Sequence, residues 1–68
     1  MTNTYTMTTA NIVRTFTAEQ FIEVMRDLFH VNSFFAKANM DSMEEGVVFY
    51  AKSDKGVIHY IVKNKAEA

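Results

Sequence analysis

The segment VVFYAKSDKGVIHYIVK, residues 47–63, decides the fold of this chain. Its two halves, 47–52 and 57–63, are rich in valine, isoleucine and aromatic residues, which favour β-strands. Between them, Ser53-Asp54-Lys55-Gly56 suits a type I turn that a glycine closes in a bulge. The sequence therefore predicts an antiparallel β-hairpin.

The length of this turn also predicts the register of the hairpin. With residues 54–56 as the loop, Ser53 opposes Val57, and counting back pairs Tyr50 with Tyr60. One face of the hairpin then carries Val47, Phe49, Ala51, Val57, His59 and Ile61, and the other carries Val48, Tyr50, Lys52, Ile58, Tyr60 and Val62. We expect a helix to cover the first face, because Ala51 leaves room for it and no lysine lies at its centre.

An amphipathic helix is predicted to begin after Thr17. Thr17 and Gln20 have the spacing of a capping box, and Phe16 and Phe21 have that of a hydrophobic staple. The apolar stripe of the helix is formed by Phe21, Ile22, Met25, Leu28 and Phe29, widened by Val24. We expect Asn32 to end the helix, since asparagine tolerates the left-handed conformation.

Three further segments complete the expected fold. Residues 11–16 alternate as a strand does, and residues 1–9 are interpreted as a flexible arm or edge strand. In residues 33–41, Phe34, Ala36, Ala38 and Met40 alternate with Phe35, Lys37, Asn39 and Asp41, which predicts a strand. A helix over 33–43 is the competing interpretation, because alanine and methionine favour helices. The prediction is a single α+β domain over 1–68, with one helix on an antiparallel sheet in the order β-α-β-β-β.

The composition limits how this domain can be stabilised. A chain of 68 residues has a thin core, yet 49% of its residues are hydrophobic, so a homodimer mate or another protein partner is expected to bury the excess. The absence of cysteine excludes a disulfide scaffold, a zinc knuckle and a thiol nucleophile. Residues 1–9 do not resemble a secretory signal and no run is long enough to cross a bilayer, so we expect a cytoplasmic protein without membrane contact.

The uncovered face of the sheet is the first candidate binding site. Phe35, Tyr50 and Tyr60, together with Ile58, Val48 and Val62, are expected to form an aromatic and aliphatic patch on it. A dimer mate, the N-terminal arm or a C-terminal segment could cover the same patch, and that alternative stays open.

Charged residues suggest two further contacts. Glu19, Glu23 and Asp27 lie on the helix, whereas the lysines, which are Lys37, Lys52, Lys55, Lys63 and Lys65, all lie in the second half of the chain. Aromatic residues beside lysines can stack the bases of a single-stranded nucleic acid. The net charge of −1 gives the chain no overall positive field to attract a nucleic acid. The alternative interpretation is that the lysines are solvated residues at strand ends.

No residue pattern indicates catalysis. His30 and His59 are the only histidines, and two imidazoles without cysteine do not make a metal site unless carboxylates surround them. Glu44 and Glu45 are interpreted as a solvated loop or an acidic contact, because neighbouring loop carboxylates point apart. We therefore predict no metal, no cofactor and no enzymatic activity.

These observations lead to the hypothesis of a small non-enzymatic protein-binding module. Its expected partner-binding residues are Phe35, Tyr50, Tyr60, Ile58, Lys52, Lys37, Glu19, Glu23 and Asp27. A short chain of this kind is typical of the inhibitors with which phages and mobile elements occlude a functional surface of a host complex, as an anti-defence protein does. The alternatives are a single-stranded nucleic-acid-binding domain and a small subunit of a larger assembly.

Overall fold

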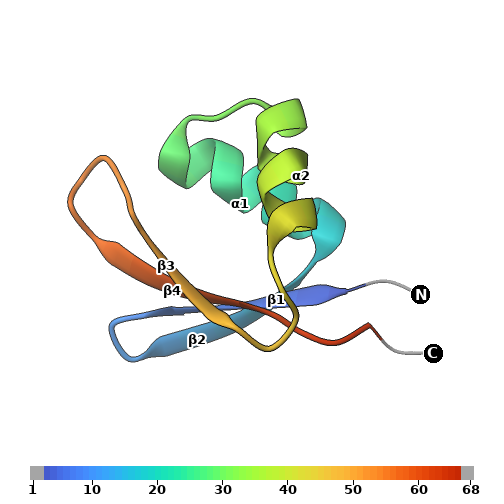
Figure 1. Ribbon diagram of the computed structural model, residues 1–68. Helices are drawn as coiled ribbons and strands as arrows, with labels where there is room; N and C mark the ends of the chain where they lie inside the picture. The colour runs from blue at the N-terminus through green and yellow to red at the C-terminus, as the bar shows by residue number, and fades with distance from the viewer. Residues whose placement is uncertain (1–2, 67–68) are drawn as a thin grey trace.

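The fold is α+β, with helices on one side of an antiparallel sheet. The computed structural model describes residues 3–66. In chain order the elements are β1 (Thr4–Thr9), β2 (Ile12–Thr17), α1 (Ala18–Phe29), α2 (Ser33–Ser42), β3 (Val48–Lys52) and β4 (Ile58–Lys63). The four strands form one sheet in the order β2-β1-β4-β3, and both helices lie on the same face of it (Figure 1).

The C-terminal hairpin has the predicted register. Tyr50 opposes Tyr60, and the Ser53 amide donates to the Val57 carbonyl at 2.9 Å. Gly56 adopts a φ of +82°, a conformation that a side chain would strain, and its amide donates to the Ser53 carbonyl at 2.9 Å. The hairpin is therefore set by its own turn, as the sequence predicts.

Strand β1 corrects the interpretation of residues 1–9 as a flexible arm or edge strand. Thr4–Thr9 lies inside the sheet, paired with β2 on one side and β4 on the other. Its alternation buries Tyr5 and Met7 beneath the helices. These two side chains are enough to hold the strand in the fold, because backbone hydrogen bonds also hold it along both edges. Residues 1 and 2 of that interpretation lie outside the described residues.

Helix α1 begins as predicted. The Gln20 amide donates to Thr17 Oγ1 at 3.2 Å, and the Thr17 amide donates to Gln20 Oε1 at 3.0 Å, which completes the capping box. The Phe16 and Phe21 rings lie 6.2 Å apart, as in a staple. The end of the helix was predicted wrongly, because His30 and not Asn32 adopts the left-handed conformation, with a φ of 55°.

Helix α2 replaces the strand that was predicted over residues 33–41. Asn32 caps it by accepting a hydrogen bond from the Phe35 amide at 2.7 Å. Ala36 and Met40, four residues apart, are buried on one helical face, and Ala36 is fully enclosed. The same two residues also fit the alternation of a strand, which is why the sequence pattern predicted a strand here.

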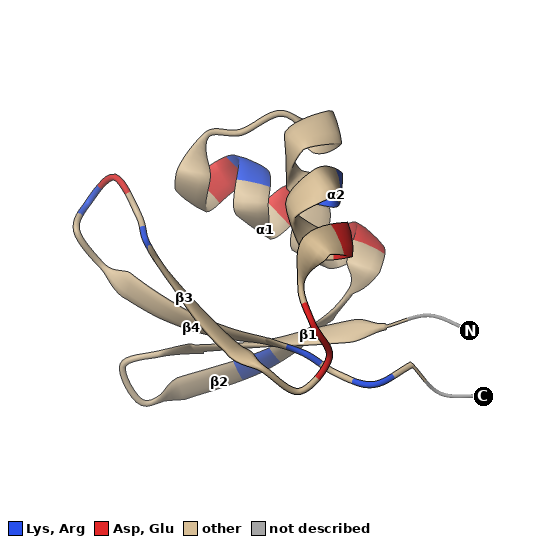
Figure 2. Cartoon of the chain, in the orientation of Figure 1, with Lys and Arg blue, Asp and Glu red and all other residues tan. Residues whose placement is uncertain are grey.

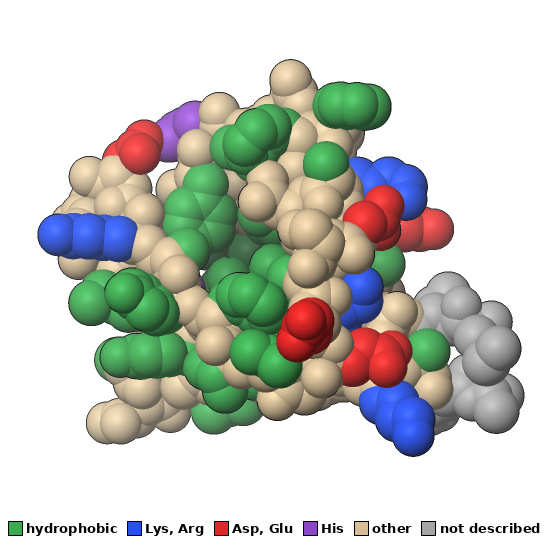
Figure 3. All heavy atoms as spheres, viewed as in Figure 1, with side chains coloured by type: hydrophobic (Ala, Val, Ile, Leu, Met, Phe, Trp, Pro, Cys, Tyr) green, Lys and Arg blue, Asp and Glu red, His purple; other side chains and the backbone are tan. Residues whose placement is uncertain are grey.

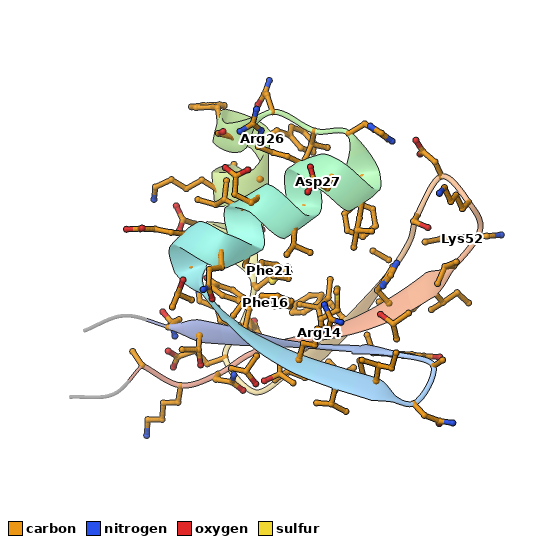
Figure 4. All side chains as sticks on the ribbon, turned by 180° about the vertical axis from the view of Figure 1, so that it is seen from behind. Arg14, Phe16, Phe21, Arg26, Asp27 and Lys52 are labelled. Carbon is orange, nitrogen blue, oxygen red and sulfur yellow. The ribbon has the colours of Figure 1, made fainter. Side chains whose placement is uncertain are left out.

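The core lies between α1 and the middle of the sheet. The Tyr5 and Phe21 rings stack with their centroids 4.9 Å apart, and Ile61 of β4 is buried beside them. Figure 4 shows Phe21 on the underside of α1 and Phe16 on β2 below it. Helix α1 packs on β1 and β2, so the helices cover this half of the sheet more completely than the β3 half.

The turn between β1 and β2 yields a stability prediction. Ala10 has a φ of 53°, which costs a residue with a side chain about 1 to 2 kcal/mol. We expect Ala10→Gly to raise the free energy of unfolding by about 0.5 to 1 kcal/mol, since glycine also loses more entropy on folding. Urea unfolding at one fixed protein concentration measures the change.

The matched control is Ala38→Gly, at an exposed position inside α2. Glycine in a helix interior costs about 1 kcal/mol, so this variant should be less stable than the wild type. A loss of stability in both variants would contradict the assignment of strain to Ala10.

Candidate binding surface

The side of the sheet that faces away from the helices, called here the open face, is built from two aligned rows of side chains. The strand register places Val13, Thr8, Tyr60 and Tyr50 in one row, and Thr15, Thr6, Val62 and Val48 in the next. Each row crosses all four strands. The β3 and β4 half is aromatic and aliphatic, whereas the β1 half carries hydroxyl groups.

The tyrosine pair dominates the open face. Tyr50 and Tyr60 are 74% and 50% exposed, and their ring centroids lie 6.5 Å apart at an angle of 47°. Val48 and Ile58 beside them are also exposed. No described residue covers this patch, because Thr4–Thr9 lies within the sheet instead of folding over it as an arm. Exposed contiguous apolar surface of this kind marks sites of contact.

The hydroxyl half of the open face is held in place by hydrogen bonds. Asn64 Nδ2 donates to Thr4 Oγ1 at 3.0 Å and to Thr6 Oγ1 at 2.9 Å. The hydroxyl groups of Thr6 and Thr15 lie 3.1 Å apart across the β1–β2 pair. These bonds restrict the side-chain rotamers, so the surface beside the tyrosines loses little entropy when a partner docks on it.

Phe35 was predicted to lie on the open face, and this was wrong. It belongs to α2, on the other side of the sheet, and is 56% exposed there. The error follows from the mistaken strand over residues 33–41. Phe35 therefore does not share the open face with Tyr50 and Tyr60.

The lysines also do not gather on one surface. Lys52 pairs with Ile58 and shares the open face, but Lys37 on α2 forms an ion pair with Asp41 at 3.2 Å. Lys63 lies on the helix side, where its Nζ donates to the Met40 carbonyl at 3.1 Å. Figure 2 shows the basic residues scattered over the turn, the helices and the sheet.

The acidic residues of the helix form a separate surface. Glu19, Glu23 and Asp27 are exposed along α1, and Glu23 pairs with Arg26 at 3.3 Å. Figure 4 shows Asp27 and Arg26 on α1, on the opposite side of the sheet from the open face. A single flat partner can reach the open face or this acidic stripe, but not both.

Each histidine has a side-chain partner within the described residues. His59 is 5% exposed, with Nδ1 only 2.6 Å from Thr9 Oγ1 and its ring edge-on to Phe29. His30 Nε2 lies 3.1 Å from Asp54 Oδ2 on the surface. Within residues 3–66, no group of three histidine, cysteine or acidic side chains could hold a metal ion. We interpret His59 as a core residue of β4, more deeply buried than the sequence suggested.

A groove that the sequence did not predict runs between the helices and β3. It encloses about 280 Å³ and is lined by Met25, Phe29, Val31, Phe35, Asn39, Met43, Phe49, Tyr50, Ala51 and Ile61. Figure 3 shows it as a hollow among hydrophobic side chains. The sequence predicted one wall of the groove, because it placed Phe49 and Ala51 on the face of the hairpin that a helix covers. The other wall combines Met25 and Phe29, which the predicted apolar stripe of α1 contains, with Phe35 and Asn39, which the strand predicted over residues 33–41 misplaced.

Glu45 joins the two ends of the described chain to the start of β3. Asn3 Nδ2 donates to Glu45 Oε2 at 2.6 Å, and the Ala66 amide donates to the same oxygen at 3.2 Å. The Asn3 hydrogen bond, followed by that of Ala66, lowers the pKa of the Glu45 carboxyl. Glu45 is therefore engaged within the chain, unlike the freely solvated loop residue that the sequence suggested.

Burial has the opposite effect on a phenol of the core. It raises the pKa of the Tyr5 hydroxyl, and the Asp41 carboxylate adds to the shift. Tyr5 thus stays neutral beneath the helices and serves packing.

Comparison with protein-family models, curated proteins and solved structures found no match. Among residues 3–66, no helix has the length and apolar character needed to span a membrane.

The Glu45 contact predicts a pH effect. A carboxyl whose pKa is lowered by folding stabilises the fold above its unfolded-state pKa, and this contribution disappears as the pH falls through the folded-state value. Carboxyl titration by NMR should give a Glu45 midpoint below that of glutamate in an unstructured peptide. Asn3→Ala should raise this midpoint, because it removes the shortest hydrogen bond to the carboxylate.

Asn39→Ala is the matched control. Asn39 Nδ2 donates to the Phe35 carbonyl on α2 and has no contact with Glu45. It should leave the Glu45 midpoint unchanged. An unchanged midpoint in Asn3→Ala as well would refute the assigned cause.

Proposed function

We propose that this protein is a non-enzymatic binding module that docks its open face against another protein. The observation that carries the proposal is the exposed row of Tyr50 and Tyr60, flanked by Val48 and Ile58, on a sheet face that no described residue covers. Tyrosine is enriched at protein interfaces, since it contributes a large contact area with few rotatable bonds.

The composition of the open face favours a protein over a nucleic acid. Lys52 is the lysine that the β3–β4 register places there, whereas Lys37 and Lys63 lie on the helix side. Nucleic-acid binding draws most of its affinity from phosphate contacts, which a chain of net charge −1 with scattered lysines supplies poorly. A surface of tyrosine, valine and threonine suits an interface with an apolar centre and a hydroxyl-rich margin.

In this proposal the protein acts by occlusion. A hydrogen-bonded sheet can cover a functional surface of a larger partner without changing its own shape, which keeps the cost of binding low. This is the mode of action proposed for a phage-type or mobile-element-type inhibitor of a host protein complex in the cytoplasm, such as an anti-defence protein. A small subunit of a larger assembly would use the same face in a permanent contact.

The test is capture of partners from a host lysate with tagged wild type and a Tyr50→Ala/Tyr60→Ala double variant. Loss of two central interface tyrosines costs about 2 kcal/mol or more, so partner affinity should fall about 30-fold or more. Phe34→Ala is the matched control, because Phe34 is an aromatic residue that is 85% exposed on α2, away from the open face. Equal recovery of partners by all three proteins would refute the proposal.

The nucleic-acid alternative predicts a different result. The wild type should then bind a single-stranded oligonucleotide at low salt, and the affinity should fall steeply as salt increases. Lys52→Ala and Tyr60→Ala should each weaken this binding. Absence of binding at low salt eliminates the alternative.

A further inference from the structure

Strand β3 forms a free edge of the sheet. Among residues 3–66, it pairs with β4 on one side and with no strand on the other. The hydrogen bond from the Ser53 amide to the Val57 carbonyl makes Ser53 a residue whose backbone groups face β4. Hydrogen-bonded positions alternate along an antiparallel strand, so the backbone groups of Ala51 and Phe49 also face β4. The amide and carbonyl groups of Val48, Tyr50 and Lys52 therefore point outward.

The free edge has one protective feature, the charge of Lys52 at its end. Strand β3 contains no proline, and its five residues pair with β4 in unbroken register, so no bulge turns the edge away within the strand. The groove between β3 and α2 runs beside the edge and leaves Ala51 and Phe49 only partly buried. Both the backbone and the apolar groove wall are thus available to a further strand.

We propose that the occupant of this edge is β3 of a second copy of the chain, paired antiparallel, so that two sheets become one. The proposal rests on the proposed function and deepens it, because the second copy adds its own tyrosines to the open face. In antiparallel pairing the same faces of both sheets stay on the same side. The row of Tyr60 and Tyr50 then continues into Tyr50 of the partner subunit and Tyr60 of the partner subunit.

The outward backbone groups define the register of this pairing. With a two-fold axis at Tyr50, Tyr50 opposes Tyr50 of the partner subunit, and Val48 opposes Lys52 of the partner subunit. All of these residues direct their amide and carbonyl groups outward, so each pair exchanges both backbone hydrogen bonds. This register uses every outward-facing residue of β3.

The side chains next to the groove are complementary in this register. Phe49 opposes Ala51 of the partner subunit, in the type of pair whose chains approach most closely. A large residue thus meets a small one twice, once on each side of the axis. The phenyl ring can enter the open side of the partner's groove, which Ala51 leaves unfilled.

Charge complementarity favours the antiparallel arrangement of two copies. Glu44 and Glu45 precede β3 and carry a charge of −2, whereas residues 52–55 hold Lys52, Asp54 and Lys55 and carry a net charge of +1. Antiparallel self-pairing brings the acidic end of each strand beside the basic end of the other. Parallel pairing would place like charges side by side.

The first experiment measures mass in solution over a wide concentration range by sedimentation velocity. The wild type should shift from one chain to two as concentration rises. Ala51→Arg should weaken the dimer about 100-fold or more, because the long cation occupies the position opposite the partner's Phe49. A wild type that stays monomeric at every concentration overturns the proposal.

Val13→Arg is the matched control. It introduces the same side chain on β2, the opposite edge strand, where Val13 is exposed. This variant should dimerise like the wild type. Dissociation by Val13→Arg without dissociation by Ala51→Arg would place the interface at β2 and overturn the assignment to β3.

Amide hydrogen exchange gives a readout that does not depend on variants. The amides of Val48, Tyr50 and Lys52 point outward and should exchange fast in the monomer but slow as concentration rises. The Thr15 amide on β2 should show no such dependence. Protection of the three β3 amides that does not change with concentration would contradict the edge pairing.

The dimer and the proposed function fail in distinguishable ways. If the wild type dimerises through β3 but captures no partner, the dimer interface is supported and the proposed function is refuted. If it captures a partner through Tyr50 and Tyr60 while monomeric, the proposed function is supported and the dimer interface is refuted. Ala51→Arg leaves both tyrosines in place, so reduced capture by this folded monomer shows that the second copy contributes to the site.

Discussion

The pairing of β1 with β4 is the constraint on which the rest of the structure depends. It joins an N-terminal hairpin to a C-terminal hairpin, and without it the chain would hold two separate ribbons, each too small to be stable alone. The register also decides what each face carries. Met7 beside Ile61 builds the floor of the core, while Thr8 beside Tyr60 extends the open face.

The stack of Tyr5 on Phe21 fastens the helices to this central pair of strands. Phe21 is fully buried, and its position follows from the capping box that begins α1 immediately after β2. Because α1 is attached directly to β2, it lies over the β1 and β2 half of the sheet. The β3 half is left with the groove and a free edge. The helices therefore cover the two halves of the sheet unequally because no loop separates β2 from α1.

Two helices can shelter only one face of a four-stranded sheet, and in so short a chain the other face keeps its apolar residues exposed. The exposed tyrosines and the free edge are adjacent because both belong to the β3–β4 hairpin. A contact with a larger protein and a contact with a second copy would therefore reinforce one another, the second enlarging the surface used by the first.

The sequence by itself determined the local features of this protein. The turn Ser53 to Gly56 set the register of the hairpin, the Thr17 capping box began α1, and strict alternation put Tyr50 and Tyr60 on a shared face. Each of these depends on neighbouring residues or on a short turn, so each can be derived from spacing. Only the tertiary structure decided that residues 4–9 are an interior strand and that residues 33–42 are a helix. Ala36 and Met40 fit both the helical and the strand period, and a threonine-rich strand is stable only between two partners. Packing between distant segments therefore made both choices, and it placed Phe35 on α2 instead of on the open face.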